Sequence, residues 1–135
     1  MSLENTSKQR IDEIIEAQKA YFASGATLEY EFRREQLLRL KKALQEWHKP
    51  LCDALWQDLH KSEQEAILTE TSIVAGEVKN HLKNLKSWMR TERRSTPLKM
   101  MPSRSRIISE PLGQSLIIAP WNYPVQLLLN PLVGA

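Results

Sequence analysis

Proline is concentrated near the end of this chain, where six of its seven prolines lie after residue 96. Proline lacks a backbone N–H and its ring clashes with the preceding helical turn, so a stretch that is rich in proline cannot form a long helix. Residues 5 to about 90 contain only Pro50, and their apolar residues recur at helical spacing. The sequence therefore predicts a helical first part, followed by loop, hairpin and one helix start.

Two helices are predicted before residue 60. The first begins at a capping box, Thr6–Gln9, and stops at Ser24-Gly25. Thr27 is predicted to cap the second helix. We expect that helix to kink or break at His48-Lys49, because Pro50 interrupts it and is suited to open the next helical piece.

A long helix is predicted from a second capping box, Ser62–Glu65, to about Arg90. His60, just before this box, is predicted to adopt a left-handed backbone conformation. Apolar residues recur along one side of the predicted helix, which should face the core: Ile67, Val74, Val78, Leu82, Leu85 and Met89.

The second part of the chain is predicted to contain two strands. The runs Ser105–Ser109 and Ser115–Ala119 are joined by Glu110–Gln114, whose proline and glycine favour a turn. The second run is continuously apolar, as expected of a strand buried on both faces of a parallel sheet. A helix is predicted to start at Pro124. These patterns divide the chain into a helical part, residues 1–103, and an incomplete part with hairpin, strand and helix start, residues 104–135.

Composition excludes several classes of protein. The single cysteine excludes a disulfide scaffold and a Cys-rich zinc site, and the three histidines lack the spacing of metal ligands, so no metal site is predicted. The net charge of +3 is too small to indicate nucleic-acid binding. A basic group in the proline-bearing stretch fits a solvated loop better than a phosphate site: Arg90, Arg93, Arg94, Lys99, Arg104 and Arg106.

Residues 1–5 show no basic start followed by an apolar run, so no signal peptide is predicted, and we expect a cytoplasmic protein. The apolar stretch 115–135 is interrupted by asparagine, glutamine and three prolines, which a lone helix in lipid would tolerate poorly. No membrane span is therefore predicted.

The stretch from residue 110 to the last residue has the most specific pattern in the chain. It reads Glu110-Pro111-Leu112-Gly113, then Ile117-Ile118-Ala119-Pro120-Trp121-Asn122-Tyr123-Pro124, then Asn130-Pro131-Leu132-Val133-Gly134-Ala135. In order and spacing it closely resembles the N-terminal part of the aldehyde dehydrogenase superfamily, nearest to the class 3 group that includes fatty and aromatic aldehyde dehydrogenases. The upstream Leu59-His60-Lys61-Ser62 and Leu82–Met89 segments fit as well. The resemblance implies an α/β parent fold with a Rossmann-type cofactor domain, of which this mainly helical chain is about the first third.

The resemblance implies functional roles around the loop after the predicted strand. Asn122 matches the asparagine whose side-chain amide helps to form the oxyanion hole. Four residues match the strand end and loop that flank the nicotinamide of NAD or NADP, namely Ile118, Ala119, Pro120 and Trp121. Tyr123 matches a position that lines the aldehyde tunnel. From the residues alone, Asn122 could instead satisfy the backbone of a turn, and Trp121 could simply pack in the core.

The resemblance also implies residues that this chain lacks. A family member needs a cysteine nucleophile and a glutamate general base, and both would lie downstream of Ala135. Cys52 instead lies in a helical stripe, as an inert buried thiol does. The parent protein is expected to be a homo-oligomer that oxidises an aldehyde to a carboxylic acid through a thiohemiacetal and a thioester, and the isolated chain is expected to be inactive. The alternative is a non-catalytic helical interaction module that uses its hairpin and the segment Val125–Leu132 to bind a partner chain.

Overall fold

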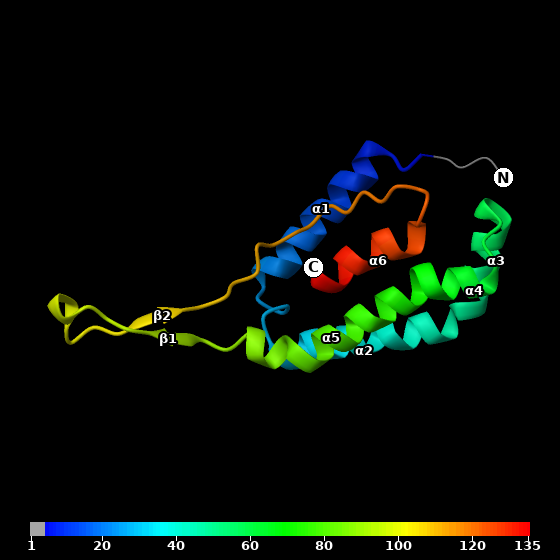
Figure 1. Cartoon of the computed structure of the whole chain (residues 1–135). Helices are drawn as coiled ribbons and strands as arrows, with labels where there is room; N and C mark the ends of the chain where they lie inside the picture. The colour runs from blue at the N-terminus through cyan, green and yellow to red at the C-terminus, as the bar shows by residue number, and fades with distance from the viewer. Residues whose placement is uncertain (1–4) are drawn as a thin grey trace.

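The computed structural model describes residues 5–135 and is mainly helical, as predicted. The helices are α1 (Lys8–Ala23), α2 (Tyr30–Glu46), α3 (His48–Leu59), α4 (Glu63–Ala66), α5 (Ser72–Trp88) and α6 (Pro124–Gly134), with a π-turn (Ile67–Thr71) between α4 and α5. Two strands, β1 (Glu92–Arg94) and β2 (Ser105–Ile107), flank a 3₁₀ turn (Leu98–Met100). Helices α2, α5 and α6 pack together, while the β1–β2 ribbon projects away from them (Figure 1).

Several predicted helix ends are confirmed. The hydroxyl of Ser62 accepts the backbone N–H of Glu65 at 3.2 Å, which caps α4. His60 adopts the predicted left-handed conformation, with φ of 52°. The predicted break occurs at Trp47, one residue earlier than expected, and Pro50 lies in the first turn of α3, where a missing N–H costs no helical hydrogen bond.

Two predicted caps are wrong. Ser7, and not Thr6, caps α1, because its hydroxyl accepts the backbone N–H of Arg10 at 3.2 Å. Thr27 does not cap α2, which begins three residues later, at Tyr30. Thr27 instead lies inside a tight turn closed by the hydrogen bond from the N–H of residue 28 to the carbonyl of residue 25, at 3.0 Å. A residue inside that turn cannot also flank the first turn of the helix.

The main core lies where α2, α5 and α6 meet. Its buried members are Leu37, Leu44, Val74, Val78, Leu85 and Val133. Val74 and Val78 are completely buried, so the predicted apolar side of the long helix is confirmed. A second cluster joins α3 to α4 through Cys52, Leu55 and Ala66, and Val125 of α6 packs against it. The second cluster therefore contacts the start of α6 through Val125, and the main core contacts its last turn through Val133.

The predicted pairing of strands is wrong. Strand β2 pairs in antiparallel register with β1, so that Arg93 lies opposite Arg106, and residues 108–120 belong to no helix or strand. Leu116 and Ile118, predicted to be buried, are 86% and 84% exposed. A strand buried on both faces needs a hydrogen-bonded neighbour and covering helices. Within the described part of the chain, residues 115–119 have no hydrogen-bonded strand neighbour, and only Ile117 and Ala119 are half-buried.

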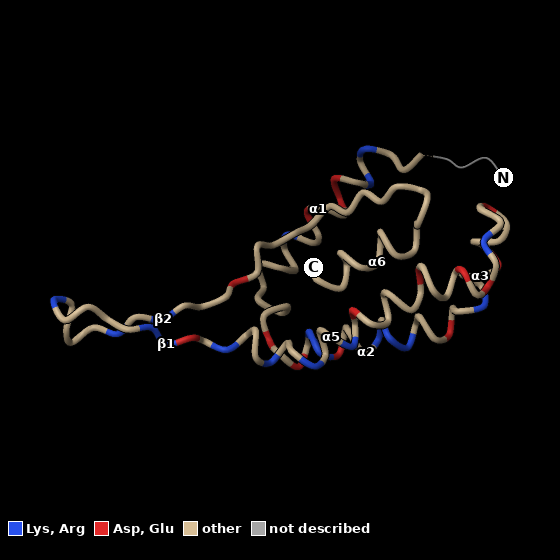
Figure 2. The backbone as a smooth tube through the Cα atoms, viewed as in Figure 1, with Lys and Arg blue, Asp and Glu red and all other residues tan. Residues whose placement is uncertain are grey.

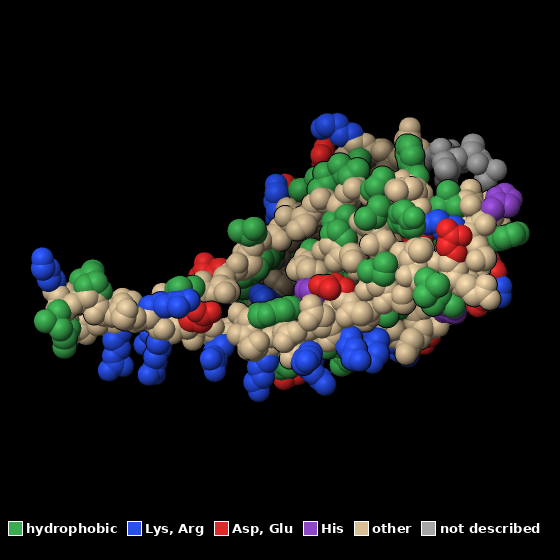
Figure 3. Space-filling view, viewed as in Figure 1, with side chains coloured by type: hydrophobic (Ala, Val, Ile, Leu, Met, Phe, Trp, Pro, Cys, Tyr) green, Lys and Arg blue, Asp and Glu red, His purple; other side chains and the backbone are tan. Residues whose placement is uncertain are grey.

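The basic group predicted to form a solvated loop is exposed. Its side chains lie on or beside the β1–β2 ribbon, along which Lys and Arg are spread in Figures 2 and 3. One ion pair joins Arg94 to Glu92 at 2.6 Å. None of the helices in residues 5–135 is both long enough and apolar enough to cross a membrane. The prediction that no signal peptide is present rests on residues 1–5, of which residues 1–4 lie outside the described residues.

Candidate functional site

The Trp-Asn-Tyr-Pro loop forms the entry to α6. Trp121 and Asn122 lie in an exposed turn, Tyr123 is half-buried, and Pro124 is the first residue of the helix. Proline suits this position because its fixed φ is helical and the N–H that it lacks would have no partner within the helix. The residue before the helix, Tyr123, makes no side-chain cap, so the first N–H groups of α6 need another acceptor.

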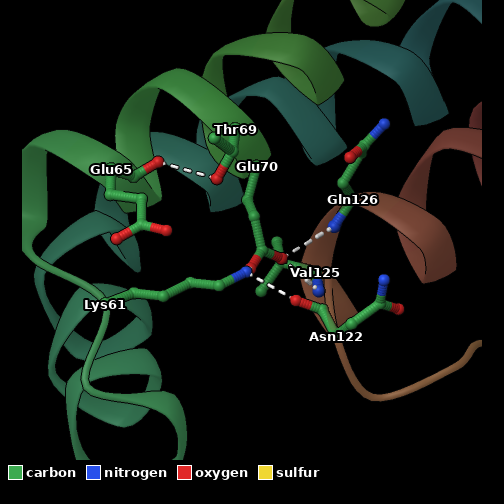
Figure 4. Close-up of polar contacts among 7 residues, drawn as sticks. All are labelled: Lys61, Glu65, Thr69, Glu70, Asn122, Val125 and Gln126. Atoms are coloured by element: carbon green, nitrogen blue, oxygen red, sulfur yellow. Dashed lines mark hydrogen bonds and ion pairs between the residues drawn. The ribbon is translucent and has the colours of Figure 1, made fainter.

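Glu70 of the π-turn provides that acceptor. Its carboxylate Oε2 accepts the N–H of Val125 at 2.7 Å and the N–H of Gln126 at 3.2 Å (Figure 4). The side chain of Glu70 is completely buried. A carboxylate is well suited to this place, because the N-terminus of a helix has a partial positive charge. Glu70 thus caps α6 from a segment 55 residues earlier in the chain.

Lys61 forms an ion pair with Glu70 and also binds the main chain of the Trp-Asn-Tyr-Pro loop. Its Nζ donates to Glu70 Oε1 at 2.6 Å and to the main-chain carbonyl of Asn122, also at 2.6 Å. The same Nζ lies 3.9 Å from the centre of the Tyr123 ring, at cation–π distance. The residue is only 7% exposed. This ammonium group therefore exchanges water for a carboxylate, a carbonyl and an aromatic face.

The side-chain amide of Asn122 is exposed and points away from the ion pair (Figure 4). Within residues 5–135 it has no hydrogen-bond partner, whereas its own main-chain carbonyl is bound by Lys61. The amide therefore does not satisfy the backbone of the turn, which was the alternative interpretation. It is available to donate to a bound molecule.

The four residues predicted to flank a nicotinamide lie in one extended run before the loop. Ile118 and Trp121 are 84% and 87% exposed, Pro120 is exposed and Ala119 is half-buried. The high exposure of Trp121 excludes its packing in the core of the described chain. The structure thus brings Trp121, Asn122 and Tyr123 into one turn, next to an apolar run that is mostly exposed.

Comparison with known proteins assigns the chain to a family. All of residues 1–135 match the sequence profile of the aldehyde dehydrogenase family. The chain belongs to that family. It is 44% identical over 117 residues to 4,4'-diaponeurosporen-aldehyde dehydrogenase of Staphylococcus aureus, a match that covers 87% of this chain and 26% of that protein. It is 49% identical over 114 residues to human aldehyde dehydrogenase family 3 member B1, covering 84% of this chain and 24% of that protein.

A solved structure agrees with this assignment. The substrate-bound state of Staphylococcus aureus AldH superposes with a TM-score of 0.89 at 40% identity, over 97% of this chain and 28% of that one. The resemblance seen in the sequence is confirmed, including its class 3 character, since several relatives are members of aldehyde dehydrogenase family 3. The chain spans about a quarter of the length of the aldehyde dehydrogenases that it matches, where about a third was expected.

The roles of Lys61 and Glu70 in this aldehyde dehydrogenase segment were not predicted from the sequence. A signal was present for Glu70, which lies three residues after Ile67 and four before Val74, on the apolar side of the long helix. Charged residues are rarely buried without a partner, so a carboxylate at such a position indicates a buried counter-charge. Lys61 gave no comparable signal, because it lies between two helices.

Cys52 is a buried structural thiol. It is 4% exposed, and burial raises its pKa, with smaller contributions in the same direction from the negative charges of Glu63 and Asp53. His48 Nε2 lies 3.9 Å from its sulfur. The raised pKa keeps Cys52 protonated at neutral pH, and the reactive form of cysteine is the thiolate.

Alkylation tests this assignment of Cys52. At pH 7 we expect iodoacetamide to modify the native chain roughly tenfold or more slowly than the chain in urea, because unfolding removes the burial that disfavours the thiolate. Mass spectrometry gives a direct readout, since Cys52 is the only cysteine. Raising the pH from 7 to about 9 should speed the unfolded reaction first, as the unfolded thiol has the lower pKa. Equal rates for native and unfolded chains would contradict the assignment.

Proposed function

We propose that this chain supplies the oxyanion-binding loop of an NAD(P)-dependent aldehyde dehydrogenase that oxidises an aldehyde to a carboxylic acid. The observation behind the proposal is the side-chain amide of Asn122, which is exposed and without a partner in the described residues, on a loop whose main chain is bound by Lys61 and Glu70. The membership of the family makes this chemistry the expected one.

The amide of Asn122 suits the charge that develops in this reaction. When a thiolate adds to an aldehyde, the carbonyl oxygen becomes an alkoxide, and a fixed N–H donor stabilises that charge more than it stabilises the neutral carbonyl. An amide stays neutral across the working pH range, so it donates a hydrogen bond without giving up a proton. The nucleophilic cysteine and the general-base glutamate would come from outside residues 1–135 of the whole enzyme.

The residues next to Asn122 fit the nicotinamide end of NAD or NADP. Ile118 and Trp121 present exposed apolar side chains, and Ala119 and Pro120 belong to a run whose backbone is outside any helix or strand. The N-terminus of α6 is already occupied by Glu70, so it does not offer a phosphate site. When bound, the cofactor supplies the acceptor for the hydride. Ile118–Trp121 would form a wall for its ring.

Tyr123 is our candidate for the aldehyde tunnel. Its half-buried ring lies against Lys61 Nζ, which fixes the ring beside Asn122. We also propose that the whole enzyme is a homo-oligomer of the cytoplasm, although one relative, from Arabidopsis thaliana, is chloroplastic by name. The competing function is a non-catalytic interaction module, for which the exposed Leu116 and Ile118 would be expected equally.

Activity measurements separate these two functions. The purified 135-residue chain is expected to show no aldehyde-dependent reduction of NAD or NADP, followed by the absorbance of the reduced nucleotide. A longer chain that continues the same reading frame past Ala135 is expected to show it. Turnover by the short chain would contradict the proposed division of catalytic residues. A longer chain that folds but has no activity with any aldehyde would favour the interaction module.

A further inference from the structure

We propose that Lys61 and Glu70 are positioning residues for the loop Trp121–Pro124, which we call the oxyanion loop. They bind the main chain on the C-terminal side of Asn122 and so fix the direction of its side-chain amide. The inference rests on the proposed function, because the direction of that amide matters only if the amide binds the reacting oxygen. Neither residue would touch substrate or cofactor.

The hydrogen bonds bracket the entry to α6. Lys61 Nζ binds the carbonyl of Asn122 at 2.6 Å, which is part of the peptide immediately after the Asn122 Cα atom. Glu70 Oε2 binds the N–H of Val125 at 2.7 Å, two peptides further on. Because peptides are planar, fixing these two groups leaves few backbone dihedrals free between them. The contact between the Tyr123 ring and Lys61 Nζ, at 3.9 Å, further restricts the conformation of Tyr123 itself.

Burial makes this arrangement rigid. Glu70 is completely buried and the side chain of Lys61 is 9% exposed. A buried ion pair is weak evidence for stability, since apolar residues of similar volume often stabilise a protein as well or better. This pair instead links three separate segments: the connection between α3 and α4, which contains Lys61, the π-turn, which contains Glu70, and the loop at Asn122. Single π-turns inside helices are frequent at functional sites, and Glu70 lies in one.

A purely structural pair would give the same contacts, so the test must depend on Asn122. The central variant is the double substitution Lys61→Met/Glu70→Gln in the full-length enzyme that contains this segment. It removes both buried charges together, nearly keeps the volume, and leaves a carbonyl oxygen at position 70 for the N–H of Val125. It abolishes the hydrogen bond to the Asn122 carbonyl. The matched control is Lys49→Met/Glu65→Gln, which makes the same chemical changes at exposed positions.

Steady-state kinetics of four enzymes then form a cycle: wild type, the double substitution, Asn122→Ala and the combination of all three changes. We expect the double substitution to lower kcat roughly 10- to 100-fold with little change in the KM for aldehyde, as misplacement of a reacting group by about 1 Å typically does. In the Asn122→Ala background the same double substitution should have less than about a twofold effect, because the group that it positions is gone. The control is expected to leave kcat unchanged.

The outcomes separate this inference from the proposed function. If Asn122→Ala leaves kcat unchanged, the proposed function is wrong and the positioning role fails with it. If Asn122→Ala lowers kcat but the double substitution has no effect, or the same effect in both backgrounds, only the positioning role is overturned. Should the double variant not fold, Glu70→Gln alone enters the cycle, and amide hydrogen exchange of Val125 and Gln126 must be faster in it than in the control.

Discussion

Replacing Asn122 with alanine in the whole enzyme is expected to lower kcat by about 10²- to 10³-fold, which corresponds to the ~2.7–4 kcal/mol that one oxyanion donor typically contributes. The effect should fall on kcat, since in the proposed role the amide would bind the developing alkoxide more strongly than the carbonyl of the bound aldehyde. The fold should be unaffected, because the side chain is exposed and the loop is bound through its main-chain carbonyl. Steady-state kinetics with one aldehyde at saturating NAD or NADP measure the change.

A matched asparagine provides the control for Asn122→Ala. Asn80 is exposed on α5, where its side chain accepts a hydrogen bond from Asn84 at 2.8 Å, far in sequence from the loop. Asn80→Ala removes an identical amide and is expected to leave kcat within about twofold of wild type. An equally small effect for Asn122→Ala would remove the chemical basis of the proposed function.

Replacing Val74 with aspartate is expected to lower the free energy of unfolding by about 3–5 kcal/mol, the usual cost of an uncompensated buried charge. Val74 is completely buried in the cluster between α2, α5 and α6, and the buried carboxylate of Glu70 lies one helical turn away on the same side. A second carboxylate there would be neither solvated nor paired. Small domains are stable by roughly 5–15 kcal/mol, so this loss would be a large fraction of the total.

Denaturant unfolding followed by the helical circular dichroism signal measures the effect of Val74→Asp. Leu68→Asp is the control, because Leu68 is 71% exposed in the adjoining π-turn and the same new charge there remains in water. We expect the control to change the free energy of unfolding by no more than about 0.5 kcal/mol. Similar unfolding midpoints for the two variants would show that Val74 is not packed in the core between α2, α5 and α6.

The features of the fold that could be predicted from sequence are those decided by a few neighbouring residues. Ser62 caps a helix through a residue three positions away, and Pro124 starts one because its own φ is fixed. Thr27 shows the limit of this reasoning. It is a good capping residue by type, but the tight turn after Gly25 places it outside the helix.

Strand pairing could not be predicted in this way, because the partner of a strand lies elsewhere in the chain. Strand β1 consists of three charged residues, Glu92–Arg94, which have low strand propensity, yet it pairs with β2 across the ribbon. The apolar run 115–119 has high strand propensity and no partner among the described residues. Strand propensity describes how well a side chain fits into a sheet. It does not indicate whether a neighbouring strand is available for pairing.

The candidate site was only partly accessible to sequence reasoning for the same reason. Asn122, Tyr123 and the run before them were found through a short contiguous pattern, and their roles remain proposals. The contact between Lys61 and the carbonyl of Asn122 joins residues 61 positions apart, which no local pattern reveals. The helical repeat shows that Glu70 is a charged residue at an apolar position. Its hydrogen-bond partners became evident only from the packing of α6 on the π-turn.

The internal cap on α6 bears on how the product of the proposed reaction would leave the enzyme. The positive end of a helix ordinarily attracts anions, and the proposed product is a carboxylate formed close to such an end. In this protein a built-in carboxylate already satisfies the first amides of the helix, and Lys61 is engaged on its far side. The carboxylate product of the proposed reaction would therefore find no unoccupied helix N-terminus beside the loop, and this favours its release.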